Sequence, residues 1–353
     1  SLNAQNPASA TNMYNVAVGY EAGYAVTTGI KNSLIGALAG DAITAGANNV
    51  ALGFEALSAN TASNGNVAIG YEALEAFNVT SDTTTFNTAV GTQAGKAMTT
   101  GVQNTLIGGL AGDAITTASN NTAVGYASLG TNTTGASNTA VGRESLFNNT
   151  TGGSNTALGL NALYANTTGG ANVAVGKDAL KSNTTASNNT AVGYQSQEVT
   201  TTGANNSSFG LHALRLNTTG SSNVAVGSAA LETNTTGANN VAIGFTAVSG
   251  NTTGGELVGI GNGALLTNTT GAFNVAVGSA SLQLNTTGAS NTAVGRFALR
   301  SNTTASNNTA VGLSALTANT TGHSNAAVGV SALSTNTTGS ANVTVGMNSL
   351  KLN

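Results

Sequence analysis

The chain has 353 residues, rich in glycine, alanine, asparagine and threonine, with only 6% charged residues and a net charge of −3. Its nine lysines and arginines are scattered, so no basic patch favours nucleic acid or an anionic membrane surface as a partner. The absence of cysteine excludes disulfides and thiolate metal sites, and no apolar run approaches the roughly 18 residues that cross a bilayer.

Residues 1–14 form a lead-in to a repeat array, which we expect to occupy residues 15–353 as one domain. From Gly19 to Gly346 a glycine recurs every 17 residues, except for one step of 21 residues between Gly70 and Gly91. A fixed period this short predicts a solenoid in which each repeat is one coil. The lead-in has no initiator Met or basic, apolar leader, and neither end shows a capping segment. We therefore expect a piece of a longer protein, or ends that meet other subunits.

Each repeat is numbered from the asparagine of the phrase Asn-x-Ala-Val-Gly, so that the recurring glycine is position five. Position four is apolar in every repeat, as in Val18, Ile35 and Leu52, which predicts a short strand whose position-four side chain faces inward. The glycine that follows indicates a corner with positive φ or a close approach of another backbone. The lack of a 3.6-residue period excludes helix.

Positions eight, nine and twelve are expected to form a second wall of the coil. Position eight is always Ala or Ser, which indicates a crowded site, and position nine is Leu in fourteen repeats. In the four repeats with Gly at position nine, the usual Asn at position twelve becomes Val26, Ile43, Met98 or Ile115. This exchange of volume predicts that both positions face one packed interior. We expect two short strands and two corners per coil, and a stack on the order of 95 Å for twenty coils.

Two segments interrupt or decorate this pattern. The 21-residue step adds four residues within 78–86, which we interpret as a tolerated loop insertion, with a protruding binding loop as the alternative. From Asn132 onwards, positions twelve to fifteen commonly read Asn-Thr-Thr-Gly, which suits a type I turn. The same letters match the N-glycosylation acceptor, but stacked copies leave little room for glycans, so the turn is the preferred interpretation.

Charged residues fall mostly at positions six, seven and ten, which we expect to face solvent. Opposite charges one coil apart predict two axial ion pairs, Lys96 with Asp113 and Arg215 with Glu232. Apolar positions three and four point to opposite faces of the strand, so both faces need cover, and a single coil offers little apolar burial. We therefore predict a parallel homotrimer with the small residues of position eight near its axis.

The phrases Asn-Val-Ala-Val-Gly-Tyr-Glu-Ala at Asn15–Ala22 and Asn-Thr-Ala-Val-Gly at Asn138–Gly142 resemble the head repeats of trimeric autotransporter adhesins. The longer phrase Asn-Thr-Ala-Val-Gly-x-x-Ala-Leu-x-x-Asn-Thr-Thr-Gly is similar to repeats in tail-fibre-domain proteins of phages and bacterial surfaces. The resemblance covers residues 15–352, although the repeat is longer than in the adhesin heads. It implies a left-handed parallel β-roll in a homotrimer, located outside the cell on a cell surface or in a virion tail fibre.

No catalytic, cofactor-binding or metal site is predicted. Glu55 and Glu72 lie one coil apart, a separation of roughly 5 Å that suits the carboxylates of a retaining glycosidase, so a polysaccharide depolymerase is weighed against an exposed repeat position, which we favour. His212 and His323 occupy unrelated repeat positions, which argues against a histidine site. Aromatic residues recur at position six, where they would pack at a subunit seam or contact glycans: Tyr20, Phe54, Tyr71, Tyr126, Tyr194 and Phe245.

The sequence thus predicts an all-β parallel β-solenoid of about twenty 17-residue coils without enzymatic activity or cofactor. We expect a structural and adhesive fibre shaft, a rigid spacer that also contacts a host receptor or glycan surface. The alternatives are an ice-binding β-solenoid and a subunit of an extracellular matrix filament. Ice binding is disfavoured because the stacked threonines of positions thirteen and fourteen are adjacent, so their side chains should diverge instead of forming one plane.

Overall fold

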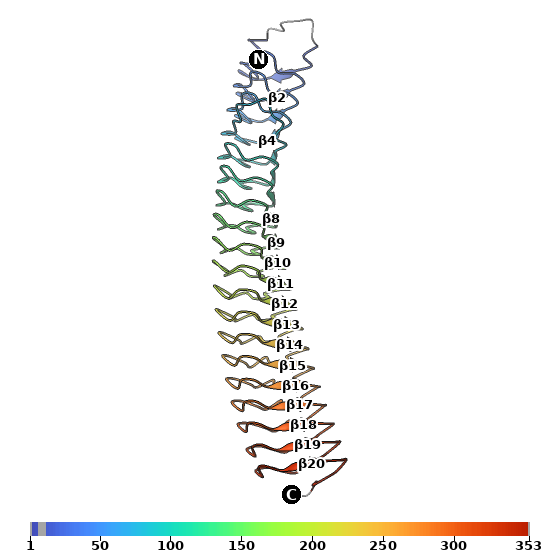
Figure 1. Cartoon of the computed structure of the whole chain (residues 1–353). Helices are drawn as coiled ribbons and strands as arrows, with labels where there is room; N and C mark the ends of the chain where they lie inside the picture. Colours follow the sequence, from blue (N-terminus) through green and yellow to red (C-terminus); the bar gives the residue numbers. More distant parts are fainter. Residues whose placement is uncertain (1, 6–11, 352–353) are drawn as a thin grey trace. The chain divides into compact units, whose positions relative to one another are not determined.

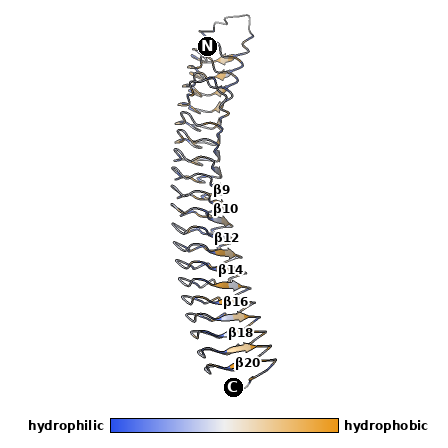
Figure 2. Cartoon of the chain, in the orientation of Figure 1, coloured by the Kyte–Doolittle hydropathy of each residue, from blue (hydrophilic) through white to orange (hydrophobic). Residues whose placement is uncertain are grey.

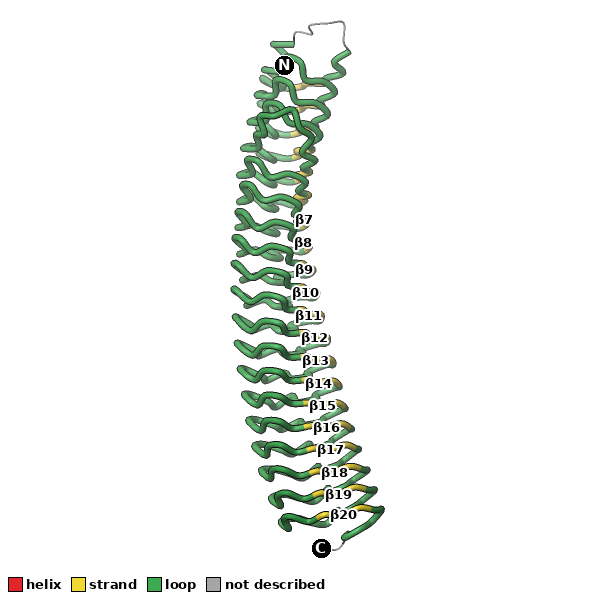
Figure 3. Tube along the Cα trace, viewed as in Figure 1, coloured by secondary structure: helices red, strands yellow, loops and turns green. Residues whose placement is uncertain are grey.

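The computed structural model describes residues 2–5 and 12–351 and comprises two compact units, residues 1–174 and 175–353. Of the expected lead-in, residues 1 and 6–11 lie outside the described residues, as do residues 352–353 at the end of the array. Each unit is a stack of coils (Figure 1). Every strand has three residues, and Figure 3 shows one strand per coil with loops and turns between. No helix occurs among the described residues, and therefore none that could span a membrane.

The strands are formed by positions two to four of each repeat. Those of the first unit are β1 (Val16–Val18), β2 (Ser33–Ile35), β3 (Val50–Leu52), β4 (Val67–Ile69), β5 (Thr88–Val90), β6 (Thr105–Ile107), β7 (Thr122–Val124), β8 (Thr139–Val141) and β9 (Thr156–Leu158). β10 (Val173–Val175) contains the boundary between the units. Those of the second unit are β11 (Thr190–Val192), β12 (Ser207–Phe209), β13 (Val224–Val226), β14 (Val241–Ile243), β15 (Val258–Ile260), β16 (Val275–Val277), β17 (Thr292–Val294), β18 (Thr309–Val311), β19 (Ala326–Val328) and β20 (Val343–Val345).

Within each unit, every strand pairs in parallel and in register with the next strand along the chain, from β1 to β9 and from β11 to β20. The register survives the 21-residue step, where Val67 of β4 lies beside Thr88 of β5. The prediction of an all-β parallel β-solenoid of about twenty coils is confirmed.

The prediction that position four faces inward is wrong. Ala51 at position three of β3 is fully buried, whereas its neighbour Leu52 at position four is 45% exposed. Leu34 and Ile35 of β2 show the same contrast, at 0% and 41%. Successive side chains of a strand point to opposite faces, and the narrow interior takes the alanine that usually occupies position three. The bulkier apolar residue therefore points out of the coil.

The prediction of a second strand per coil is also wrong. Positions six to eleven form consecutive turns in which non-glycine residues adopt the left-handed region, such as Glu55 with φ 53° and Leu57 with φ 55°. This conformation is costly for L-residues. It is held here by bonds between coils, because Leu57 N donates to Ala73 O at 2.9 Å and Glu72 N donates to Phe54 O at 2.9 Å.

The recurring glycine meets both conditions that its pattern predicted. Gly142, at position five, has φ +131°, and a Cβ there would lie 2.6 Å from the carbonyl oxygen of Gly159 in the next coil. Any side chain would therefore be strained and would collide with the stacked backbone. The close approach of coils at this corner requires glycine.

The predicted exchange of volume between positions nine and twelve is confirmed. A Cβ on Gly40 at position nine would lie 2.8 Å from Ile43 Cδ1 and 2.9 Å from Leu34 Cδ2. Leu34 at position three, where alanine is usual, thus shares in filling the space that glycine leaves. Position eight also faces this interior, since Ala56 is fully buried. The small residue there is explained within one chain and requires no axis between subunits.

Two files of buried asparagine lie in the core: one at position one, interrupted by Leu257, and one at position twelve from Asn132 to Asn336, interrupted by Thr200. Asn49 at position one receives from the backbone N–H of Asn66 at 2.9 Å and donates to Ser63 O at 3.0 Å. At position twelve, Asn149 Nδ2 donates to Asn132 Oδ1 at 2.8 Å in the preceding coil and to Gly152 O at 2.9 Å in its own. The turn interpretation of Asn-Thr-Thr-Gly is therefore incomplete, because this asparagine is a core residue. Its full burial also leaves no room for a glycan on Asn132 in the folded chain.

The threonines at positions thirteen and fourteen diverge, as predicted. Thr133 is half-buried and its hydroxyl donates to Thr150 O at 3.1 Å in the next coil, whereas Thr134 is exposed. The hydroxyls of the position-thirteen threonines therefore form hydrogen bonds between stacked coils. The threonines of the two positions do not form one plane.

The extra residues of the long coil are fastened to the preceding coil. Asn64 N donates to Thr83 O at 2.9 Å, and Asn64 Nδ2 donates to Asp82 Oδ1 at 2.7 Å. Asn64 and Thr84 also form an isolated parallel bridge. Asp82 and Thr83 themselves stay exposed, so the insertion is an ordered surface feature of the first unit.

Candidate functional site

A carboxylate cluster lies on the turn side of the first unit. It consists of Glu55 and Glu72 at position seven and Glu75 at position ten. Carboxylate oxygens of these three residues lie within 4.8 Å of one another, because coils stacked in register align their position-seven and position-ten side chains. The proximity of Glu55 and Glu72 is confirmed. Glu75 was not singled out by the sequence, although its place three residues after Glu72 on the same surface was a usable signal.

Lys96, in the coil after Glu72, supplies the positive charge of this cluster. Its ammonium group forms an ion pair with Glu72 and lies 3.4 Å from Glu75 Oε2, while Gln93 Nε2 donates to Glu72 at 2.9 Å. The predicted pair of Lys96 with Asp113 is wrong: Lys96 turns towards the two carboxylates of the preceding coil instead of the single one in the following coil.

The surroundings of the cluster shift the pKa values of its carboxyl groups in opposite directions. The hydrogen bond from Lys96, with others from Tyr71 and Gln93, lowers the pKa of Glu72 to about 2. Burial raises the pKa of Glu55, and the negative charges of Glu75 and Glu72 raise it further. Glu72 is only 8% exposed, so the expectation that position seven is solvent-facing does not hold there, nor at Asp178, which is 5% exposed.

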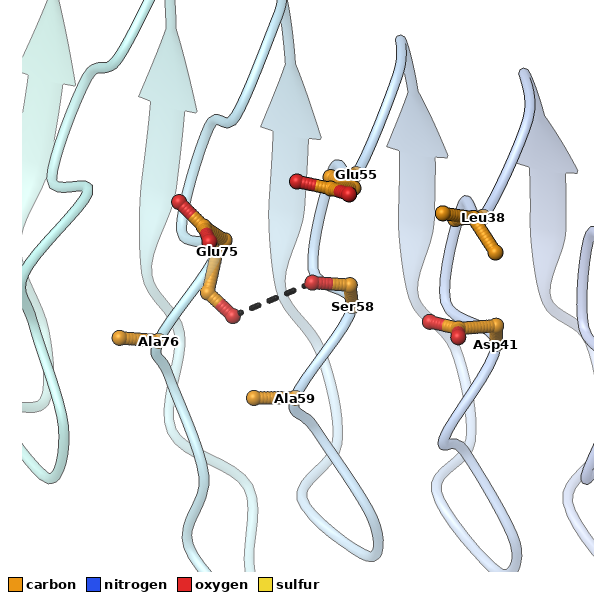
Figure 4. A pocket seen from close by; sticks show the side chains of 7 residues that line it. All are labelled: Leu38, Asp41, Glu55, Ser58, Ala59, Glu75 and Ala76. Carbon is orange, nitrogen blue, oxygen red and sulfur yellow. Dashed lines mark hydrogen bonds between the residues drawn. The ribbon is translucent and has the colours of Figure 1, made fainter.

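A shallow hollow of about 320 Å³ opens beside Glu55 and Glu75. Figure 4 shows their side chains on adjacent coils, with Asp41 from the coil before them and Ser58 donating to the backbone oxygen of Glu75 at 3.4 Å. Burial raises the pKa of Asp41, and its Oδ1 has no hydrogen-bond partner within residues 2–5 and 12–351. The complete lining is Leu38, Asp41, Glu55, Ser58, Ala59, Glu75 and Ala76.

The chemistry of this cluster favours an internal ion network. Glu55, Glu72 and Glu75 offer the oxygen ligands that a hard cation prefers, but the ammonium of Lys96 already balances two of them. A retaining glycosidase needs a carboxylic acid that keeps its proton beside an ionised nucleophile. The raised pKa of Glu55 and the lowered pKa of Glu72 match a protonated acid and an ionised nucleophile, respectively. Glu72, however, is already ion-paired with Lys96.

The second unit carries a comparable group of charged side chains, in which an arginine balances a glutamate. Arg215 Nε and Nη2 lie 3.1 Å from Glu232 Oε1, which confirms the predicted axial pair. His212 Nε2 lies 3.0 Å from Gln195 Oε1 and its Nδ1 lies 3.8 Å from Glu232. His323 has a different role, since its Nδ1 accepts from Ser306 N at 3.0 Å. These contacts are between neighbouring coils and hold the stack together.

The outer strand face, defined as the side chains of positions four and six, carries most of the exposed large apolar residues. Figure 2 colours the strand arrows of the second unit towards the hydrophobic end of the scale. The exposed members in the first unit are Val18, Tyr20, Ile35, Leu52, Phe54, Tyr71, Ile107, Tyr126, Leu158 and Leu160. Those in the second unit are Tyr194, Phe209, Leu211, Val226, Ile243, Phe245, Val294, Leu313, Val328, Val330, Val345 and Met347.

All six aromatic residues singled out at position six are exposed on this face. Phe54 and Tyr71 stack with ring centroids 5.7 Å apart and an interplanar angle of 12°. In the second unit, Tyr194 lies between Lys177, 5.8 Å from its centroid, and the His212 ring, also at 5.8 Å. The stacked rings of Phe54 and Tyr71 cover one another's faces, which suits packing against an apolar surface better than stacking on a sugar ring.

The sequence matches no protein-family model and no curated protein.

Proposed function

We propose that the protein is a structural fibre shaft built by parallel self-association through the outer strand face. The observation that carries this proposal is the outward apolar side chain of position four, present in coil after coil of both units. Monomeric soluble proteins rarely expose contiguous apolar patches of more than a few hundred Å². A β-solenoid is compatible with a shaft because each coil contacts only its neighbours and the array grows in one direction.

The proposed oligomer is a parallel homotrimer. Identical coils at the same height of each chain would meet through positions four and six, so that one contact is repeated at every coil. The resemblance of the repeats to adhesin heads and tail-fibre-domain proteins supports three chains and a location outside the cell, on a bacterial surface or in a phage tail fibre. Position-six aromatics that the oligomer leaves open would serve as contacts to a host receptor or glycan.

The oligomeric state tests this proposal. Sedimentation equilibrium of the whole chain is expected to give three times the monomer mass. The variant Val226→Lys/Ile243→Lys places two charges on the outer strand face of adjacent coils and is expected to weaken association at least tenfold while leaving the circular dichroism spectrum unchanged, because neither side chain is in the core.

The matched control is Thr236→Lys/Thr253→Lys, which adds the same charges to exposed position fourteen of the same two coils. This control should associate like the unaltered chain. A monomeric unaltered chain, or equal loss of association in both variants, would show that the outer strand face is not the contact.

A further inference from the structure

One cross-section of the second unit has polar side chains at interior positions where the neighbouring coils have alanine and leucine. Gln197 stands at position nine in place of leucine, and Thr200 at position twelve in place of asparagine. Ser196 at position eight and Ser208 at position three of the next coil complete the section. All four side chains are fully buried.

The amide of Gln197 is held in one orientation. Its Nε2 donates to Thr190 O at 3.0 Å and to Ser208 Oγ at 2.7 Å, which uses both amide hydrogens. A flipped amide would place its oxygen against the oxygen of Thr190, so the assignment is fixed by the network. Gln197 Oε1 is consequently directed away from these groups, and it is buried without a hydrogen-bond partner among the described residues.

Thr200 leaves a second buried polar atom unmatched. In a regular coil such as that of Asn234, the position-twelve amide donates both to the asparagine of the preceding coil and to its own Gly237 O. Thr200 has a shorter hydroxyl in place of that amide, and its Oγ1 is buried without a hydrogen-bond partner in the part of the chain that the structure describes. Positions nine and twelve face one interior, as the 2.8 Å approach of a Cβ on Gly40 to Ile43 Cδ1 shows. Thr200 N donates to Gln197 O at 3.2 Å, so the two residues belong to one turn, and both of their side chains are fully buried.

We propose that this section of the core binds one internal water molecule between Gln197 and Thr200. The water donates a hydrogen to Gln197 Oε1 and accepts the hydroxyl hydrogen of Thr200. Buried polar groups in folded proteins are nearly always paired with protein or with ordered water, and a buried water typically joins two to four such groups. The amide oxygen of Gln197 can only accept a hydrogen bond, and the hydroxyl of Thr200 can donate one. One water molecule can therefore bond to both groups.

Magnetic relaxation dispersion of water nuclei tests the site, because it counts water molecules held inside the protein. The variant Gln197→Leu/Thr200→Asn restores the pair found at Leu214 and Asn217 in the next coil, so it is expected to fold. It should hold one long-lived water fewer than the unaltered chain. Thr200→Val removes the hydroxyl at nearly constant volume and should give the same loss of one.

The control Leu265→Met changes position nine of a regular coil without a hydrogen-bonding group and should keep the original count. A crystal structure of the unaltered chain should show a peak about 2.7–3.2 Å from both Gln197 Oε1 and Thr200 Oγ1. Equal water counts in the unaltered chain and both Thr200 variants would overturn the proposal. So would density showing Gln197 Oε1 bonded directly to Thr200, or a monovalent cation at the site.

Discussion

The inner wall and the outer strand face of each coil carry similar apolar side chains in opposite environments. In the coil of β9, Leu163 at position nine is fully buried, while Leu158 at position four is 46% exposed. The inner wall is closed by small residues, buried asparagine and stacked backbone of the same chain. None of the described residues covers the outer strand face in this way. In such a solenoid an apolar residue type therefore does not by itself indicate a buried side chain. The space that neighbouring side chains leave inside the coil decides which apolar residues are buried.

The largest contrast is expected from truncating these two leucines. Leu163→Ala leaves a cavity in a closed core and should lower the free energy of unfolding by about 2–5 kcal/mol. Leu158→Ala should cost under about 1 kcal/mol in the dissociated chain, since half of the side chain is already in water. Denaturant unfolding at a concentration low enough to dissociate any oligomer measures both. Similar losses in the two variants would mean that the outer face is covered by its own chain.

The second contrast concerns polar side chains of one coil. Asn149→Ala removes a fully buried amide and deprives Asn132 Oδ1 of its donor, whereas Gly152 O keeps the donor Asn138 Nδ2. It should therefore cost about 1–3 kcal/mol for each buried group left unpaired. Its neighbour Asn148, at the half-buried position eleven, is the control, and Asn148→Ala should change stability by less than about 0.5 kcal/mol. Thermal unfolding of the two variants side by side decides whether the asparagine file stabilises the coil.

The period of the sequence was sufficient to predict the stacking of the coils. The glycine at position five predicted a corner with positive φ, as Gly142 has, and the exchange at Gly40 and Ile43 located the interior. Whether the side chain of position four points into or out of the coil was not predictable in the same way. Positions three and four are both apolar, and a three-residue strand offers no longer alternation to decide between them. The width of the interior decides, and it is set by backbone turns that non-glycine residues form at positive φ.

The recurring asparagines could be recognised in the sequence, but the hydrogen bonds between them could not. Asparagine is common in turns, so Asn149 had a sufficient local explanation, while its bond to Asn132 exists only when coils stack in register. The carboxylate cluster was predicted in part, since Glu55 and Glu72 repeat at position seven. Lys96 was assigned the wrong partner because a long side chain reaches either neighbouring coil. Two carboxylates on one side outweigh one on the other.

A smaller effect is expected from the aromatic pair on the outer strand face. A double-mutant cycle of Phe54→Ala and Tyr71→Ala in the dissociated chain should give a coupling of about 0.5–1 kcal/mol, because the rings stack at 5.7 Å. The reference cycle pairs Phe54 with Tyr126, which lies several coils away and should show no coupling. A coupling near zero for Phe54 and Tyr71 would indicate that the rings separate in solution and are ordered only by a partner.

The smallest contrast is electrostatic and depends on pH. The pKa of Glu72 is lowered from 4.5 to about 2 in the folded chain, so its ionised form favours folding. That contribution is complete above the unfolded value of 4.5 and is lost as the pH falls towards 2. The stability of the unaltered chain relative to Glu72→Gln should therefore be constant above about pH 5 and shrink below it. In the Lys96→Met background the principal cause of the lowered pKa is absent, and the pH dependence of the Glu72→Gln difference should largely disappear. Urea unfolding at pH values from 7 to 2.5 measures the four chains. A difference that persists unchanged at pH 2.5 would mean that the ion pair of Glu72 with Lys96 does not form in solution.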